Sequence, residues 1–145
     1  MKLLYIANVR LPTEKVHGMQ VARMADAFQK CGHTVELIVP LLKRNPPSTE
    51  EFYNLETKLT IRRIPTWPWR ASWFSFVLSS LIFGVFSAFY AFWKRGIIYS
   101  IDLDDFSFFL MPFLRKPYFF EMHAPKERTI PLRLLFSKIT GVIAT

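Results

Sequence analysis

The residues best placed to do chemistry are His123 and Glu121, at the end of the apolar segment 117–122. That segment predicts a strand, and an imidazole at its carboxyl end could donate a hydrogen bond to a ligand hydroxyl or share charge with a departing phosphate. The structural alternative for His123 is a loop histidine with a local partner. Glu121 either orients His123 or simply ends the strand.

A second set of candidates lies in the loop 8–20, after the first apolar segment, 2–7. Gly18 opens a predicted helix there, and a glycine lets the backbone approach a ligand with its N–H groups or serves as a plain turn residue. The loop does not spell GxGxxG, so dinucleotide binding is unsupported. His17, beside Gly18, could contact a ligand or be solvated.

A third set is the acidic string Asp102-Leu103-Asp104 after the segment 97–101. Paired carboxylates of this kind hold a divalent ion that bridges a diphosphate in one class of transferase, but either aspartate can instead cap the helix that follows. We favour the cap and expect no bound metal. Lys126 and Arg128, with Arg133 further on, could meet a phosphate, although solvated charge is the commoner explanation.

The elements that must position these residues alternate along the chain. Apolar segments at 2–7, 34–39, 59–64, 97–101, 117–122 and 141–145 predict strands, and 18–31, 50–55, 104–114 and 131–138 predict helices. Unbroken apolar strands that alternate with helices indicate a parallel sheet with helices on both faces. Ligands bind such sheets beyond the carboxyl ends of the strands, where the candidates above lie.

Residues 71–93 form an uncharged stretch that is long enough to cross a bilayer. A crossing would place the strands at 59–64 and 97–101 on opposite sides of a membrane, so we favour a crossover helix. Its small residues Ser80, Gly84 and Ala88 would pack inward. Helical spacing then turns Phe86, Phe89, Tyr90 and Trp93 outward, with a dip into a membrane surface as the alternative to an ordinary buried helix.

The composition of the chain limits the kinds of partner that it is expected to bind. The 145 residues suit one domain, and a formal charge of +8 with 17% aromatic residues favours an anionic membrane surface over nucleic acid. Cys31 is the single cysteine, which fits a reduced, cytoplasmic setting. The chain stops at Thr145 without a turn or polar tail, so we expect the natural product to continue.

Four segments together resemble a known family. The opening segment 2–40 places a glycine-bearing loop between a strand and a helix that ends in "GH", followed by "TVELIVP". "RGIIYSIDL", "KPYFFEMHAP" and "ITGVIAT" follow in order. This combination resembles the amino-terminal domain of family 4 retaining glycosyltransferases of the GT-B fold. The string around Asp102 keeps that family's aspartate but not the histidines often beside it, which weakens any acceptor role for this edge.

The resemblance implies an α/β, Rossmann-like domain over residues 1–145 that holds a saccharide or lipid-linked acceptor. The nucleotide-sugar donor would be bound by a carboxyl-terminal domain that this chain lacks, so the isolated chain should be inactive. No metal or other cofactor is implied. Gly18 would lie near the donor phosphate and His123 would face the reacting sugar. The alternative is a non-catalytic Rossmann-like binding or membrane-anchoring module, since fold alone does not fix function.

Overall fold

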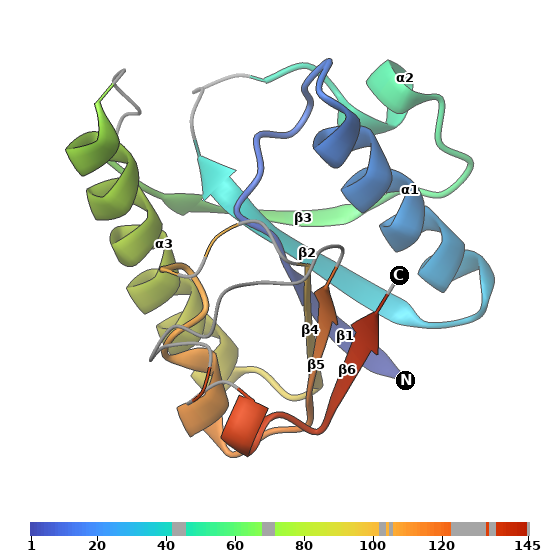
Figure 1. The fold of residues 1–145 in the computed structure, drawn as a ribbon. Coiled ribbons are helices and arrows are strands. Elements are labelled where there is room, and N and C mark those ends of the chain that lie inside the picture. Colours follow the sequence, from blue (N-terminus) through green and yellow to red (C-terminus); the bar gives the residue numbers. More distant parts are fainter. Residues whose placement is uncertain are drawn as a thin grey trace.

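The computed structural model describes residues 1–41, 46–67, 72–101, 104, 106–122, 133 and 136–144. Its strands are β1 (Lys2–Ile6), β2 (Thr34–Leu41), β3 (Thr60–Pro65), β4 (Ile97–Ile101), β5 (Tyr118–Met122) and β6 (Gly141–Ala144). They form one parallel sheet in the order β3-β2-β1-β4-β5-β6 (Figure 1). The predicted α/β, Rossmann-like architecture is confirmed.

Helices cover both faces of the sheet because the strands are apolar on both sides. Leu3 and Tyr5 of β1 pack with α1 (Val16–Lys30) and α2 (Thr49–Tyr53), whereas Leu4 and Ile6 pack with α3 (Trp73–Trp93) and the short 3-10 helix η1 (Met111–Leu114). This alternation within one strand gives two cores, one on each face.

The order of the strands reverses at β1. The chain runs from β1 to β2 and β3, then returns through α3 to β4 on the other side of β1. The carboxyl ends of β1 and β4 therefore form a topological switch point, where ligands of open parallel sheets commonly bind.

The uncharged stretch forms the predicted crossover helix, α3. It joins two strands of one sheet, and its predicted small face of Ser80, Gly84 and Ala88 is buried. A Cβ atom on Gly84 would lie 2.8 Å from the carbonyl oxygen of Ser107, so the glycine lets α3 approach the segment after β4. Phe86, Phe89 and Trp93 point outward as expected, whereas Tyr90 is partly buried.

One predicted helix is largely absent. In the described part of 104–114, which leaves out residue 105, only Met111–Leu114 are helical, as η1. The Asp104 carboxylate accepts the N–H groups of Phe106 and Ser107 at 2.9 and 2.7 Å. Those bonds fold the preceding residues into turns. In the predicted helix 131–138, residue 133 and residues 136–138 are helical, and the others lie outside the described residues.

Candidate functional site

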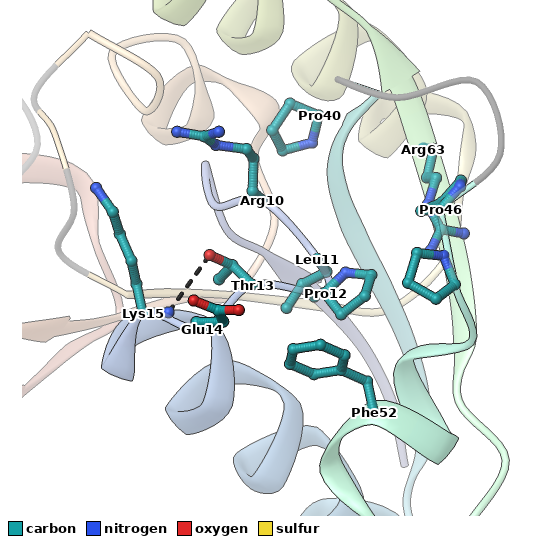
Figure 2. A pocket seen from close by; sticks show the side chains of 11 residues that line it. Arg10, Leu11, Pro12, Thr13, Glu14, Lys15, Pro40, Pro46, Phe52 and Arg63 are labelled. Carbon is teal, nitrogen blue, oxygen red and sulfur yellow. Dashed lines mark hydrogen bonds between the residues drawn. The ribbon is translucent and has the colours of Figure 1, made fainter.

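A cavity of about 340 Å³ opens at the carboxyl ends of β1, β2 and β3 (Figure 2). One wall is the loop Arg10–Lys15 between β1 and α1, and the others come from the end of β2, from α2 and from β3. The lining side chains are Arg10, Leu11, Pro12, Thr13, Glu14, Lys15, Pro40, Pro46, Pro47, Phe52 and Arg63. The cavity therefore combines a proline-rich and aromatic wall with charged groups at the edge of the sheet where ligands are expected.

The loop that forms this wall is fixed by Tyr53 of α2. The Thr13 N–H donates to the Tyr53 hydroxyl at 2.7 Å, and the same hydroxyl donates to the Thr13 carbonyl oxygen at 2.7 Å. Burial raises the pKa of Tyr53, so the phenol stays neutral and can serve as donor and acceptor together. The cavity wall is thus pre-formed by contacts within the protein.

Gly18 is part of the same unit. A Cβ atom there would lie 2.2 Å from Thr13 Cγ2 and 2.7 Å from the Tyr53 hydroxyl, so the missing side chain lets the loop and α2 close over α1. The Gly18 N–H donates to the Lys15 carbonyl oxygen at 3.0 Å. The structure gives Gly18 a packing role, and its predicted contact with a ligand stays a prediction.

The charge of the cavity favours anions. Arg10, Lys15 and Arg63 supply three cationic side chains against the single carboxylate of Glu14. The amino terminus of α1, which adjoins Lys15, has no side-chain cap and no acidic residue in its first turn. Its partial positive charge therefore adds to that of the lining cations. A phosphate or carboxylate is the ligand that this arrangement suits best.

A buried hydrogen-bond network lies at the switch point, beside the cavity. Asn8 Nδ2 donates to Ser80 Oγ of α3 at 3.0 Å and to Asp104 Oδ2 at 2.7 Å, which ties the loop after β1 to the segment after β4. Ser107 Oγ also donates to Asp104 Oδ2, at 2.8 Å. With its two backbone bonds, the Asp104 carboxylate accepts four hydrogen bonds.

Four donors occupy the lone pairs of the Asp104 carboxylate, which leaves none for a cation. Asp104 thus organises a turn, close to the capping role favoured from the sequence, while its companion Asp102 lies outside the described residues. Within the described ranges, no group of three or more histidine, cysteine or acidic side chains is placed to hold a metal.

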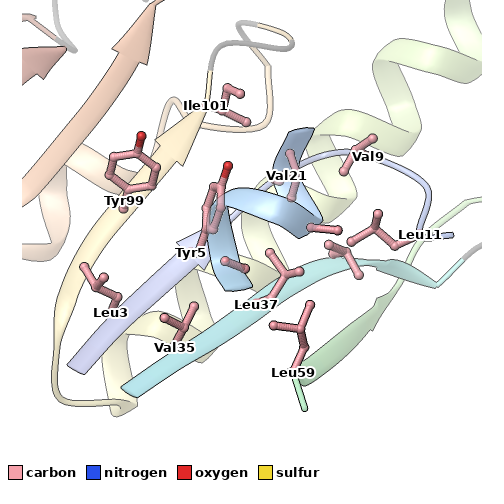
Figure 3. Packing of buried hydrophobic residues seen from close by; sticks show 14 of the residues in the cluster. Leu3, Tyr5, Val9, Leu11, Val21, Val35, Leu37, Leu59, Tyr99 and Ile101 are labelled. Atoms are coloured by element: carbon pink, nitrogen blue, oxygen red, sulfur yellow. The ribbon is translucent and has the colours of Figure 1, made fainter. Parts of the chain in front are cut away.

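Glu121 lies in a second polar cluster, on β5. It is 1% exposed and accepts a hydrogen bond from the Tyr99 hydroxyl, and the Tyr99 ring meets that of Tyr5 edge to face at 5.0 Å (Figure 3). Burial, followed by the hydrogen bond to Glu121, raises the pKa of Tyr99. Burial and these two neighbours likewise raise the pKa of Tyr5. Glu121 does not end its strand, because it pairs with Ile101 and Ile143 on both sides.

The sequence-predicted site residues are not gathered in one place by the described part of the chain. Gly18 adjoins the cavity wall, His17 is exposed on the first turn of α1, and Glu121 lies on β5, beyond β4. Four others, His123, Asp102, Lys126 and Arg128, fall outside the described residues.

The basic residues of the cavity were missed from the sequence. Arg10 follows the first strand and Arg63 lies near the end of the third, so both stand where the carboxyl ends of parallel strands meet. That position relative to the strand ends was the signal that could have identified them.

Comparisons of the chain with protein-family models, with curated proteins and with solved structures found no match. The likeness to glycosyltransferases therefore rests on the sequence motifs alone.

Proposed function

We propose that this chain is the acceptor-side half of a GT-B glycosyltransferase that transfers a sugar from a nucleotide-sugar donor with retention. The observation that carries the proposal is the cationic cavity at the carboxyl edge of a Rossmann-like sheet. The ordered motifs of segment 2–40 and of the later strand edges support it independently.

In this proposal the cavity holds the acceptor. Arg10 and Lys15 on one side of the cavity, and Arg63 on the other, supply the cationic groups for a phosphate-bearing saccharide or lipid-linked acceptor (Figure 2). The proline and phenylalanine wall packs against the apolar part of that acceptor. His17, exposed at the start of α1, can contact the acceptor from outside. Lys126 and Arg128 are further candidates for the acceptor phosphate.

His123 is proposed to face the reacting sugar and donate a hydrogen bond to it. The bond between the anomeric carbon and the diphosphate breaks, and the oxygen of the acceptor hydroxyl forms the new bond on the same face. The hydroxyl proton passes to the departing diphosphate oxygen, and the nucleoside diphosphate leaves. The donor and its main cationic partners belong to a second domain outside residues 1–145, so the isolated chain is expected to be inactive. No step requires a metal or other cofactor, and the Cys31 thiol suits a cytoplasmic setting.

The test is a sugar-transfer assay on the full natural polypeptide that contains this chain, with a panel of nucleotide sugars and with phosphate-bearing acceptors. We expect transfer with at least one donor and a loss of about a hundredfold in turnover for His123→Ala. His33→Ala is the matched control, because His33 lies after α1 against Phe28. Absence of transfer by the unaltered polypeptide would overturn the proposal, and near-normal turnover in His123→Ala would remove His123 from it.

A non-catalytic membrane-anchoring module is the second candidate, favoured by the exposed aromatic residues of α3. It predicts that the natural polypeptide has no donor-binding domain. A downstream domain with two glutamates in a donor loop would support the enzyme instead.

A further inference from the structure

α3 buries its polar residues and exposes large apolar ones, which is the reverse of the usual arrangement for a surface helix in water. Its serines, Ser75, Ser79, Ser80 and Ser87, are all buried, while its outer face carries large apolar side chains. The exposed ones are Trp73, Phe74, Val85, Phe86, Phe89, Phe92 and Trp93. A helix that faces solvent shows the opposite arrangement, so the outer face of α3 is built for an apolar neighbour.

Cations border this face. The Arg62 guanidinium and the Lys94 ammonium lie 5.0 and 5.2 Å from the centre of the Tyr90 ring. Beside them is an apolar groove of about 220 Å³ formed by Ile64, Pro65, Phe86, Phe89, Tyr90, Trp93 and Lys94. Arg95 follows, exposed, and the whole chain carries a formal charge of +8. Aromatic side chains next to cations match the boundary between acyl chains and anionic headgroups.

We propose that the outer face of α3 lies in the interface of an anionic lipid bilayer, with the helix axis along the membrane surface. By length and composition α3 is also able to cross a membrane. However, β3 before it and β4 after it belong to one sheet, which a crossing would divide. A parallel orientation keeps the sheet intact and buries the aromatic side chains in one leaflet. The inference goes beyond sugar transfer and holds without it.

A second copy of the chain is the competing occupant. Pairing two α3 faces through the aromatic residues of their carboxyl-terminal halves would bring the cations Arg62, Lys94 and Arg95 of both copies together, and like charges across an interface oppose association. An anionic surface satisfies the same cations. The charge of the border therefore selects lipid over self-association.

The test is vesicle flotation of the 145-residue chain with phosphatidylcholine vesicles, with and without phosphatidylglycerol. We expect binding only with the anionic lipid. F86S/F89S should weaken it roughly a hundredfold, because two half-exposed phenyl rings lose their apolar contact. The matched control is V16S/M19S, since Val16 is 68% and Met19 is 39% exposed but both lie on α1, across the sheet, and neither lines the cavity. Lys94→Gln should weaken binding about fivefold.

Light scattering on the same proteins separates the outcomes. A monomer that floats with anionic vesicles, and loses flotation in F86S/F89S but keeps it in the control variant, supports the proposal. A dimer that F86S/F89S dissociates, with no flotation of the unaltered chain, assigns the face to a second copy and overturns it. Equal binding by F86S/F89S and the unaltered chain also overturns it, and so does equal binding to neutral and anionic vesicles. Circular dichroism confirms that each variant is folded.

Discussion

α1 and α3 lie on opposite faces of one sheet and distribute their polar residues in opposite ways. In α1 the buried positions include Val21, Ala22 and Ala25, and charged residues such as Arg23 lie outside. In α3 the serines lie inside and most of the aromatic residues outside. We therefore propose different surroundings for the two faces: a polar ligand beside α1 and lipid against α3.

The largest expected effect is a loss of stability, and it should differ between the buried and exposed sides of α3. Phe83 is 0% exposed and Phe89 is 64% exposed. Phe83→Ala should lower the free energy of unfolding by about 3–5 kcal/mol, because it leaves a cavity in the core. Phe89→Ala should change it by less than about 0.5 kcal/mol. Urea denaturation measures both. Equal losses would show that the outer face is already covered in the dissolved protein.

The next effect concerns Asp26, the buried acid of α1. It accepts hydrogen bonds from the N–H and hydroxyl groups of Thr57 at 2.8 and 2.6 Å and pairs with Lys30 at 2.9 Å. Burial alone would raise the pKa of Asp26, but these partners outweigh burial and hold it below its ordinary value of 3.8. Asp26→Asn should therefore cost about 2 kcal/mol at neutral pH.

Because the folded-state pKa of Asp26 is lowered, its contribution is complete above the unfolded value and is lost as the pH falls through the folded value. Unfolding curves from neutral pH down to strongly acidic pH should show this loss in the unaltered chain and a smaller loss in Asp26→Asn. Glu14→Gln, an exposed acid, is the control. Parallel pH curves for the Asp26 variant and the unaltered chain would contradict the assignment.

A smaller effect is expected at Tyr53, which holds the cavity loop. Tyr53→Phe removes both hydrogen bonds to Thr13 and should lower the free energy of unfolding by about 1–2 kcal/mol. It should also weaken binding of a hexose 1-phosphate, since the loop carries Arg10 and Lys15. Tyr90→Phe, which removes a hydroxyl on the α3 side, should leave that affinity unchanged in calorimetric titrations. The reverse result would place the ligand on the other face.

The smallest expected effects concern two arginines of β3 that lie on opposite faces of the sheet. Arg62 and Arg63 are neighbours on β3, but Arg62 lies over Tyr90 of α3 and Arg63 lines the cavity. Arg63→Ala should weaken hexose 1-phosphate binding about fivefold with little effect on lipid, and Arg62→Ala should do the opposite. Calorimetry and flotation measure the two affinities. Equal effects of both variants on both ligands would remove the distinction.

Patterns of neighbouring residues predicted the strands and long helices well. The strand at 97–101 has the predicted bounds, and Gly32 after α1 has the expected positive φ of 81°. The helix expected over 104–114 was wrong in extent, because the turn there depends on Asp104, which also bonds to Asn8, 96 positions earlier. A local pattern contains no information about that partner.

The cavity escaped prediction for the same reason. Its wall depends on Thr13 meeting Tyr53, 40 positions later, and on Gly18 leaving room for both. The sequence indicated the correct edge of the sheet but not which basic residues line it. Tyr90 is half-buried, whereas helical spacing predicted an outward position, because its hydroxyl donates a hydrogen bond to Glu36 of β2.

The most direct test of the cavity's role is amide chemical-shift mapping of the 145-residue chain during titration with a hexose 1-phosphate. We expect saturable shifts at Arg63 and at the amides of residues 10–15 other than Pro12, none along the outer face of α3, and no response to the neutral hexose. Shifts that avoid the cavity loop, or equal shifts with the neutral sugar, would contradict it.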